Sequence, residues 1–288
     1  MDIEIIEMAD RKAKFVLKNS SPAMANALRR TLLSDIPKMA IDTVEFYTGK
    51  IEGDDGKEYE SITPLFEEII AHRMGMLPVP TDLDLFVPQD ECKCGGEGCP
   101  SCTIIYSLQK TGPSTVYSSD LQPLAGPASE KLRIVDEFIP IVELTADQGI
   151  TVYAKAVMGT AKKHVKWQVC NGVGYMYKPE IIIDPKHASD EQVVACAQLC
   201  PAGLEVKSKK LVVKDPVACA YAKGCLEKLE EVDGITVNWE GEDRKDKTKD
   251  FLFRFETDGS MTAQKALDVA CEILSKESKD FAKDITAL

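Results

Sequence analysis

The chain has 288 residues, of which 44% are hydrophobic, and it carries a formal net charge of −12 with a pI near 4.9. This length admits two or three modest domains, and this hydrophobic content supports a packed core and excludes wholesale disorder. An acidic chain is a poor stand-alone nucleic-acid binder, because phosphate contacts need clustered lysines and arginines. If the chain works near DNA, we therefore expect it to do so through partner proteins.

Neither a membrane span nor a secretory signal is predicted. No apolar run approaches the ~20 residues that a membrane-spanning helix needs, and the N-terminus, MDIEIIEMAD, is acidic and alternating. The chain has ten cysteines. Without a secretory signal, these indicate a reducing, cytoplasmic compartment and metal ligation rather than disulfides.

The first elements are a hairpin and a helix. Hydrophobic and charged residues alternate over 3–8 and 13–17, which predicts two strands joined by a turn. The stretch 19–37, NSSPAMANALRRTLLSDIP, then predicts a helix with Ser21 as its N-cap and Pro22 in its first turn. One apolar face is formed by Met24, Leu28 and Leu32. On pattern alone, such a face is typical of an amphipathic core helix.

A further strand over 41–47 and a polar surface loop over 52–59 precede a second helix. The stretch 61–78, SITPLFEEIIAHRMGMLP, predicts that Thr63 caps this helix and that Pro64 opens it. Gly75 would supply a left-handed C-terminal cap.

Both helical stretches resemble signatures of one family. NALRRTLLSDIP is similar to the assembly helix of the α-type subunits of cellular RNA polymerases, and AHRMGMLPVPTD is similar to the family's second signature. The family includes the bacterial α N-terminal domain, the eukaryotic third-largest subunit and their archaeal counterpart. The segment 164–167, HVKW, resembles the point where the family's chain returns from its insert domain. Two signatures in the right order are much more specific than either one.

A first cysteine cluster lies in the stretch 91–103, ECKCGGEGCPSCT. Its members are Cys92, Cys94, Cys99 and Cys102. Intervening glycines allow tight turns, and four thiolates this close together suit a closed tetrahedral zinc site. A chance cysteine-rich loop and an iron–sulfur cluster remain the alternatives. The family resemblance favours zinc, since some archaeal and eukaryotic members carry zinc in this loop. Alternating hydrophobic runs over 104–157 then predict a mostly antiparallel β domain that ends near residue 166.

A second cysteine cluster follows a strand over 175–183 and a capping box at 189–192 that opens a helix. Its members are Cys196, Cys200, Cys219 and Cys225. The cluster resembles a degenerate form of the bacterial-type ferredoxin double motif. Laid on that motif, Cys200, Cys219 and Cys225 would share one cluster, and Cys196 would be the remaining ligand of the other. Three thiolates are the ligand count of a [3Fe–4S] cluster, with [4Fe–4S] as an alternative and buried free thiols as another. Cys170 and Cys271 have no partner pattern, and we expect both to be buried thiols.

The C-terminal region predicts a charged loop over 241–250, a strand over 251–256 and a last helix. The strand carries alternating phenylalanines. The helix begins at Thr262, and its apolar stripe is marked by Ala263, Leu267, Ala270, Leu274 and Phe281. Strand, turn and long helix are also how the family closes its dimerisation domain.

We therefore expect an α+β protein with three parts. A discontinuous α-type dimerisation domain would comprise residues 1–43, 167–184 and 232–288. A mostly antiparallel β insert domain with the zinc loop would comprise residues 44–166. A ferredoxin-like iron–sulfur domain would comprise residues 185–231.

The resemblance implies a non-catalytic assembly subunit of a DNA-directed RNA polymerase. It would pair with the small α-like subunit L and seat small subunits N and P and the two large catalytic subunits. The interface residues would be Met24, Leu28, Leu32, Leu267 and Leu274. The sequence shows no D-x-D-type carboxylate triad of the polymerase kind and no phosphate-binding glycine loop, so we expect no activity from the chain alone. The alternatives are a ferredoxin-like electron-transfer or redox protein, which leaves the two helix signatures unexplained, and a generic zinc scaffold, which leaves the second cysteine cluster unexplained.

Overall fold

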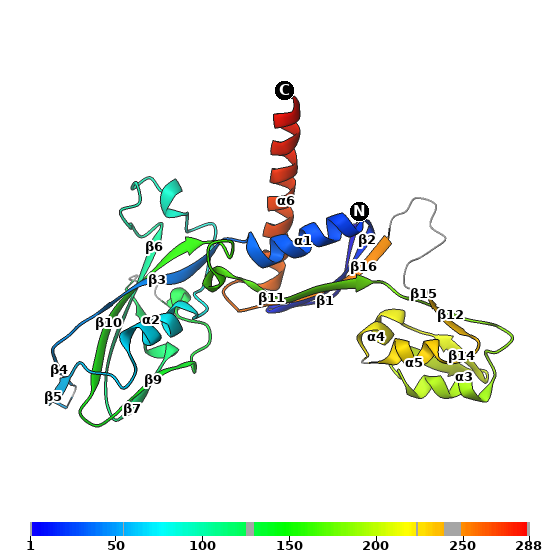
Figure 1. The fold of residues 1–288 in the computed structure, drawn as a ribbon, viewed down its shortest axis with the longest axis horizontal. Coiled ribbons are helices and arrows are strands. Elements are labelled where there is room, and N and C mark those ends of the chain that lie inside the picture. Colours follow the sequence, from blue (N-terminus) through cyan, green and yellow to red (C-terminus); the bar gives the residue numbers. More distant parts are fainter. Residues whose placement is uncertain (1, 54, 125–129, 223, 239–248, 287–288) are drawn as a thin grey trace. The chain divides into compact units, whose positions relative to one another are not determined.

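A computed structural model describes residues 2–53, 55–124, 130–222, 224–238 and 249–286 (Figure 1). The chain forms two compact units. Unit 1 comprises Met1–Met8, Ala13–Arg29 and Gly174–Arg254, and unit 2 comprises Ala9–Lys12, Arg30–Val173 and Phe255–Leu288. Both helices and strands are present, as expected for an α+β protein. The charged loop expected over 241–250 lies outside the described residues except at its last two positions.

A four-stranded sheet combines strands from both ends of the chain, in the order β1-β2-β16-β11. Its strands are β1 (Asp2–Ala9), β2 (Lys12–Ser20), β11 (Cys170–Tyr177) and β16 (Lys249–Thr257). The expected N-terminal hairpin and the aromatic strand are thus confirmed. Phe15 stacks on Phe253 with ring centroids 5.0 Å apart, and both side chains are fully buried. Aromatic burial of this kind contributes heavily to a core.

The first helix, α1 (Pro22–Ser34), forms as the sequence predicts. The Ser21 hydroxyl accepts a hydrogen bond from the backbone N–H of Met24 at 3.3 Å, which satisfies one otherwise unpaired donor at the helix start. The helix ends before Pro37. Leu28 and Leu32 are both buried within the chain, as expected for the apolar face of an amphipathic helix.

Unit 2 contains a four-stranded antiparallel sheet with the order β3-β10-β6-β8. These strands are β3 (Lys38–Phe46), β6 (Thr103–Thr111), β8 (Gln122–Pro123) and β10 (Gly149–Gly159). Two short hairpin-like pairs accompany it, β4 (Lys50–Glu52) with β5 (Glu58–Glu60) and β7 (Ser114–Tyr117) with β9 (Pro140–Leu144). The β4–β5 pair corrects the expectation of a plain loop over 52–59. A large apolar core, which includes Ile70, Tyr106 and Val152, fills this part of unit 2.

The second helix, α2 (Glu67–Gly75), begins three residues later than the sequence predicted. The Thr63 hydroxyl donates to the Leu65 carbonyl instead of capping a helix, and Phe66 is extended. Gly75 is the last helical residue and has no left-handed conformation. A Cβ on Gly75 would lie 3.5 Å from the Ile41 carbonyl oxygen, which is ordinary van der Waals contact, so neither its backbone conformation nor packing on β3 demands glycine here.

The segment 164–167 forms a short turn, η4 (Val165–Trp167), within unit 2. The indole N–H of buried Trp167 donates to the Val157 carbonyl at 3.0 Å. Buried Lys38 forms an ion pair with Asp258 and donates to the Lys166 carbonyl at 3.1 Å. This paired lysine joins the start of β3, η4 and the turn after β16. A buried charge is tolerated when it is paired and hydrogen-bonded in this way.

A small α/β region occupies residues 180–238 of unit 1. Strand β12 (Glu180–Ile183) pairs with β15 (Ile235–Asn238), and β13 (Leu204–Lys207) pairs with β14 (Lys210–Val213). The helices are α3 (Glu191–Ala195), α4 (Pro216–Tyr221) and α5 (Cys225–Glu230). The strand expected over 175–183 is divided between β11 and β12. The expected capping box does not form, because Asp190 occupies the N-cap position and its carboxylate pairs with His187 at 2.8 Å.

The last helix, α6 (Ala263–Thr286), is 24 residues long, or about 36 Å at 1.5 Å per residue. The Thr262 hydroxyl accepts from the N–H of Lys265 at 3.2 Å and caps its start. The first turns are buried and the later turns are largely exposed. Cys271 is exposed, which corrects the expectation of a buried thiol there, whereas Cys170 is buried as expected. Among the described residues, no helix is long and apolar enough to cross a membrane.

Candidate metal centres and assembly surface

Cys92, Cys94, Cys99 and Cys102, hereafter the four-cysteine loop, bring their sulfur atoms together in unit 2. All four sulfurs lie within 4.8 Å of one another. The chain can turn this tightly because Gly95, Gly96 and Gly98 all have positive φ angles, of 68°, 88° and 90°. Glycine adopts this conformation without steric cost, whereas other residues rarely do. The sequence pattern therefore correctly indicated both the grouping of the thiols and the role of the glycines.

The spacing of these sulfurs fits a single tetrahedral ion. Four neighbouring Sγ–Sγ distances are 3.4 Å for Cys92–Cys94, 3.5 Å for Cys92–Cys99, 3.7 Å for Cys94–Cys102 and 4.0 Å for Cys99–Cys102. A zinc ion with Zn–S bonds of about 2.3 Å requires sulfurs about 3.8 Å apart in a regular tetrahedron. The donor set and its size therefore suit zinc.

The electrostatics of the four-cysteine loop already favour one thiolate. The pKa of Cys94 is lowered to about 5, chiefly because the backbone N–H of Cys99 hydrogen-bonds to its sulfur. For Cys92, the N–H of Cys94 acts in the same direction, but its neighbouring thiols and burial outweigh it and raise the pKa to about 12. Since metals bind thiolates, the loop presents one ionised ligand before any metal arrives.

A second group, the three-cysteine group, consists of Cys200, Cys219 and Cys225 in unit 1. Their sulfurs also lie within 4.8 Å of one another, and all three residues are buried. Cys219 lies on α4 and Cys225 begins α5. Burial is the largest cause that raises the pKa of Cys225 to about 11, and it also raises the pKa of Cys219. These thiols form part of the small apolar core of the region.

Cys196 stands apart from this group. Among the described residues, the candidate metal ligands that gather here are the other three cysteines. The Cys196 thiol instead donates to the Gln192 carbonyl at 3.3 Å, within its own helical segment. The sequence motif left open whether Cys196 is a ligand, and the structure places its sulfur outside the group.

Gly203 is a residue of this site that sequence reasoning missed. A Cβ on Gly203 would lie 2.4 Å from the Cys219 sulfur and 3.0 Å from the Cys200 sulfur. Glycine at 203 therefore leaves the space beside the sulfurs open, although its φ angle is not unusual. No local signal marked it, because the contact depends on the approach of α4.

The three-cysteine group fits iron–sulfur chemistry in its donors. Buried thiolates are the ligands of iron–sulfur clusters, and an apolar surrounding is typical of such sites. A cluster of several irons is wider than a single ion, so the sulfurs would need to separate by side-chain rotation to receive it. The arrangement therefore supports soft-metal ligation by three thiolates and leaves the nuclearity to chemical analysis.

The residues expected at an assembly surface divide into two sets. Leu28, Leu32 and Leu267 are buried within the chain, whereas Met24 is 39% exposed and Leu274 is half-buried. Their contact with a partner stays a prediction.

The later turns of α6 add an apolar surface. Phe281 is 68% exposed and Ile285 is 55% exposed, and both lie on the same helix as Leu274. Residues 274, 281 and 285 are spaced by seven and four, so their side chains share one face of the helix. Figure 1 shows this end of α6, in red, extending beyond the rest of unit 2. An apolar helix face that the described residues of its own unit leave exposed is typical of a protein–protein contact.

Comparison with known proteins decides the family. The RNA polymerase Rpb3/Rpb11 dimerisation domain matches residues 14–278. The chain belongs to this family. A relative in Thermoplasma volcanium, named DNA-directed RNA polymerase subunit Rpo3, is 41% identical over 271 residues, which cover 94% of each chain. Relatives with the same name in Picrophilus torridus and Methanosarcina acetivorans are 39% and 34% identical over 285 residues, covering 97–99% of each chain.

Membership in the Rpb3/Rpb11 family agrees with the two helix signatures and with the strand–turn–helix ending of the chain. It gives no support to the ferredoxin-like redox alternative, which accounted only for the second cysteine cluster. The match extends from 14 to 278 and so passes across the residues of both units. The division into a discontinuous dimerisation domain and two further domains, with the boundaries given above, stays a prediction.

Proposed function

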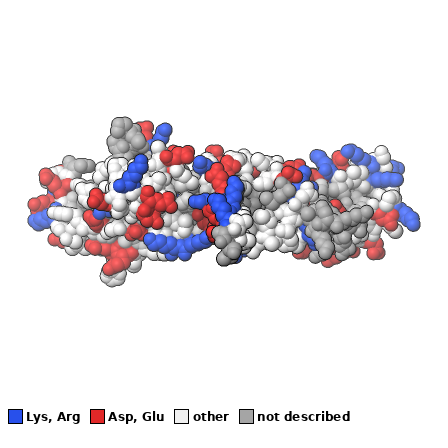
Figure 2. All heavy atoms as spheres, turned by 90° about the horizontal axis from the view of Figure 1, so that it is seen from above, with Lys and Arg blue, Asp and Glu red and all other residues white. Residues whose placement is uncertain are grey.

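We propose that the chain is a non-catalytic assembly subunit of an archaeal, cytoplasmic DNA-directed RNA polymerase. It pairs with a small α-like subunit of the L type and provides a platform for small subunits N and P and for the two large catalytic subunits. Nucleotidyl transfer takes place on other subunits, and DNA is contacted only indirectly. Figure 2 supports the last point for the face that it presents, where acidic side chains are interspersed among lysines and arginines.

The apolar stripe on the C-terminal turns of α6 is the observation that carries this proposal. Phe281 and Ile285 leave large apolar surfaces in water, and burying such a side chain contributes roughly 1.5–3 kcal/mol. The chain belongs to a dimerisation family, so a partner helix is the natural cover for this stripe. Leu274 would extend the same contact, and the exposed Met24 on α1 is a further expected interface residue.

The two metal centres support this scaffold. The four-cysteine loop would hold zinc, and the three-cysteine group would hold a [3Fe–4S] cluster, with [4Fe–4S] as the alternative. When bound, each would supply a cross-link between chain segments. The region around the three-cysteine group has a small core, and small units usually need such a cross-link for stability. The cluster is thus a structural staple in this proposal.

Replacement of Phe281 by Asp tests the pairing. The side chain is exposed, so the variant should fold normally, but the charge would be buried in the heterodimer at a cost of several kcal/mol. We expect co-expressed Phe281→Asp protein to lose the L-type partner in gel filtration. The matched control is Phe66→Asp, since Phe66 is 78% exposed at the start of α2. A full-strength heterodimer in Phe281→Asp would exclude this helix face from the interface.

A further inference from the structure

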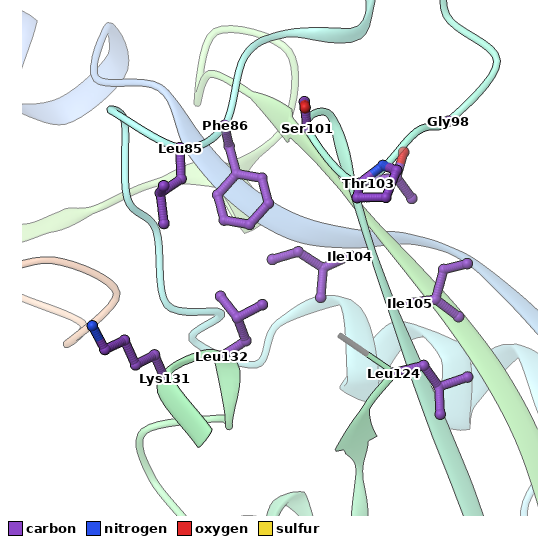
Figure 3. Close-up of a pocket in the computed structure, with 11 residues that line it drawn as sticks. Leu85, Phe86, Gly98, Ser101, Thr103, Ile104, Ile105, Leu124, Lys131 and Leu132 are labelled. Atoms are coloured by element: carbon purple, nitrogen blue, oxygen red, sulfur yellow. The ribbon is translucent and has the colours of Figure 1, made fainter. Parts of the chain in front are cut away.

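A largely apolar cavity of about 620 Å³ opens in unit 2 beside the four-cysteine loop (Figure 3), and we refer to it as the β6 groove. Its floor consists of the buried side chains of Phe86, Ile104 and Leu132, which converge from three separate segments. Its rim includes Leu85 and Leu124, which are 61% and 58% exposed. Apolar rim residues over an apolar floor form a continuous patch of the kind that proteins use for binding.

The four-cysteine loop supplies one wall of the β6 groove. Gly98, Pro100 and Ser101 line it and lie beside or between the ligand cysteines. The Ser101 carbonyl accepts a hydrogen bond from the N–H of Val87 at 3.0 Å, which joins this wall to the segment that carries Leu85 and Phe86. The shape of the groove therefore depends on the conformation that a bound metal would fix.

Strand addition is not how this groove would bind a partner. The Ile105 carbonyl already accepts from the N–H of Leu124 at 2.8 Å, and the N–H of Thr103 donates to the Cys99 carbonyl at 3.0 Å. Backbone groups of β6 beside the groove are thus already used. Recognition must come from side chains inserted into the apolar space and from charge at its margin.

Charge at the margin comes from Lys131, which is the single charged residue among the described residues that line the groove. Lys131 is exposed, and within the described parts of the chain no ion pair involves it. Figure 3 shows its side chain at the edge of the groove and not over the floor. A carboxylate next to an inserted apolar side chain would complement this arrangement, because rim charges orient a partner while the apolar centre provides affinity.

We infer that the β6 groove docks a segment of another polymerase subunit, which inserts a large apolar side chain over Phe86, Ile104 and Leu132 and places an aspartate or glutamate beside Lys131. This inference rests on the proposed function, since it needs a multi-subunit assembly. It gives the four-cysteine loop a role in that assembly, which is to hold one wall of a docking groove. This contact is separate from the pairing surface on α6.

Site-directed photo-crosslinking in the reconstituted polymerase tests the inference. A benzophenone amino acid replaces Leu85 in one protein and Leu124 in another, and the matched control replaces Phe138, which is 80% exposed and does not line the groove. We expect both groove positions to crosslink to one segment of another subunit, with an acidic residue close to a large apolar one. We expect no crosslink to that segment from position 138.

Other crosslinking results would overturn the inference. These are crosslinks to a second copy of this chain, to this chain's own residues or to the same segment from position 138, and the absence of protein crosslinks from both groove positions. Without protein crosslinks from either position, the groove would be filled by solvent or by a small apolar carboxylate, and not by another subunit. The L-type heterodimer is assayed in parallel. If it forms while the groove crosslinks fail, only this inference is wrong, whereas loss of the heterodimer from all proteins would refute the proposed function itself.

Two substitutions separate charge from metal in this contact. Lys131→Glu should lower the crosslink yield from Leu124 roughly fivefold, as expected for reversal of a rim charge, and Lys131→Arg should retain it. Cys99→Ser should lower the same yield while the heterodimer persists, because the loop wall loses its metal. Equal crosslink yields in Lys131→Glu and in the protein with Lys131 would show that the partner places no acidic residue beside Lys131. A crosslink yield that is unchanged in Cys99→Ser would show that the four-cysteine loop does not hold the wall of the groove.

Discussion

The two cysteine groups reach similar sulfur spacing by different routes. The four-cysteine loop gathers its thiols between positions 92 and 102, with three glycines shaping the turn. The three-cysteine group draws its thiols from positions 200, 219 and 225, two of them on separate helices. The first is formed by local backbone geometry, whereas the second exists only when α4 and α5 pack against the rest of their region.

This difference also appears in the chemistry of the thiols. In the four-cysteine loop, a backbone N–H stabilises the Cys94 thiolate and lowers its pKa to about 5. In the three-cysteine group, burial raises the pKa values of Cys219 and Cys225. A local site can thus be prepared for a metal by its own turns. A buried, non-local site is costly to ionise and gains most when metal binding and folding occur together.

The largest effect should follow from Cys219→Ser. Its thiol is fully buried in the small core, and loss of a ligand would remove both the iron and the cross-link. We expect new proteolytic cuts within residues 185–232, loss of iron and preserved binding of the L-type partner. Equal protease resistance with and without iron would show that the cluster does not stabilise this region. Loss of the partner on iron removal would instead mean that the cluster controls assembly more directly.

Gly203→Ala tests the same group without removing a cysteine. The added methyl group would lie far inside contact distance of the Cys219 and Cys200 sulfurs, and such overpacking typically costs about 1–3 kcal/mol. We expect strongly reduced iron content by elemental analysis. Gly75→Ala is the control, because Gly75 is not in the left-handed region and a Cβ there would make only ordinary contacts, at 3.5 Å or more. Normal iron content in Gly203→Ala would mean that the sulfurs move away from Gly203 on metal binding.

Cys99→Ser should have a more local effect. We expect the protein to lose one zinc equivalent, to keep its iron and to retain the protease resistance of residues 185–232. The reason is that the four-cysteine loop lies in unit 2 and shares no ligand with the other group. If iron disappears and zinc remains, the assignment of the two metals must be reversed.

Alkylation of the metal-free protein at pH 7 should show the difference in ionisation between the thiols of the two cysteine groups. Cys94 is half-buried and, with a pKa of about 5, almost fully ionised. Cys225 is buried with a pKa of about 11, so its thiolate fraction is ~10⁻⁴. We expect iodoacetamide to modify Cys94 first among the seven clustered cysteines and Cys225 at least tenfold more slowly, as measured by mass spectrometry of peptides. Similar alkylation rates for Cys94 and Cys225 would show that the backbone of the four-cysteine loop does not stabilise the Cys94 thiolate.

The smallest effect concerns the turn that leads into α3. Hydrogen bonding to Asp190 raises the pKa of His187 above its ordinary value. A raised pKa in the folded state adds stability that is fully present below pH ~6.5 and is lost as pH rises through the folded pKa. NMR titration should therefore show a pKa above 6.5 for His187, and Asp190→Asn should lower it. If the pKa of His187 is unchanged in Asp190→Asn, the His187–Asp190 hydrogen bond does not form in solution.

Much of the molecule followed from sequence because the signals were local. The hairpin before α1, the Ser21 cap, the aromatic strand around Phe253 and the start of α6 at Ala263 all depend on alternation, capping and turns within a few residues. The four-cysteine loop belongs to this class, since its glycines and thiols are neighbours in the chain. The family signatures in α1 and α2 were equally local.

Other features were missed, some of them because they depend on segments that meet only in the folded chain. The start of α2 was misplaced because the Thr63 hydroxyl donates to the Leu65 carbonyl instead of capping, and Gly75 ends the helix without a left-handed turn. Nothing local indicated that Gly203 lies beside two sulfurs or that Cys196 points to its own helix. The sequence by itself thus determined the family, the elements and the thiols that could bind metal. Tertiary packing alone decided that Gly203 lies beside two sulfurs and which leucines are buried, because those contacts join residues distant in the chain.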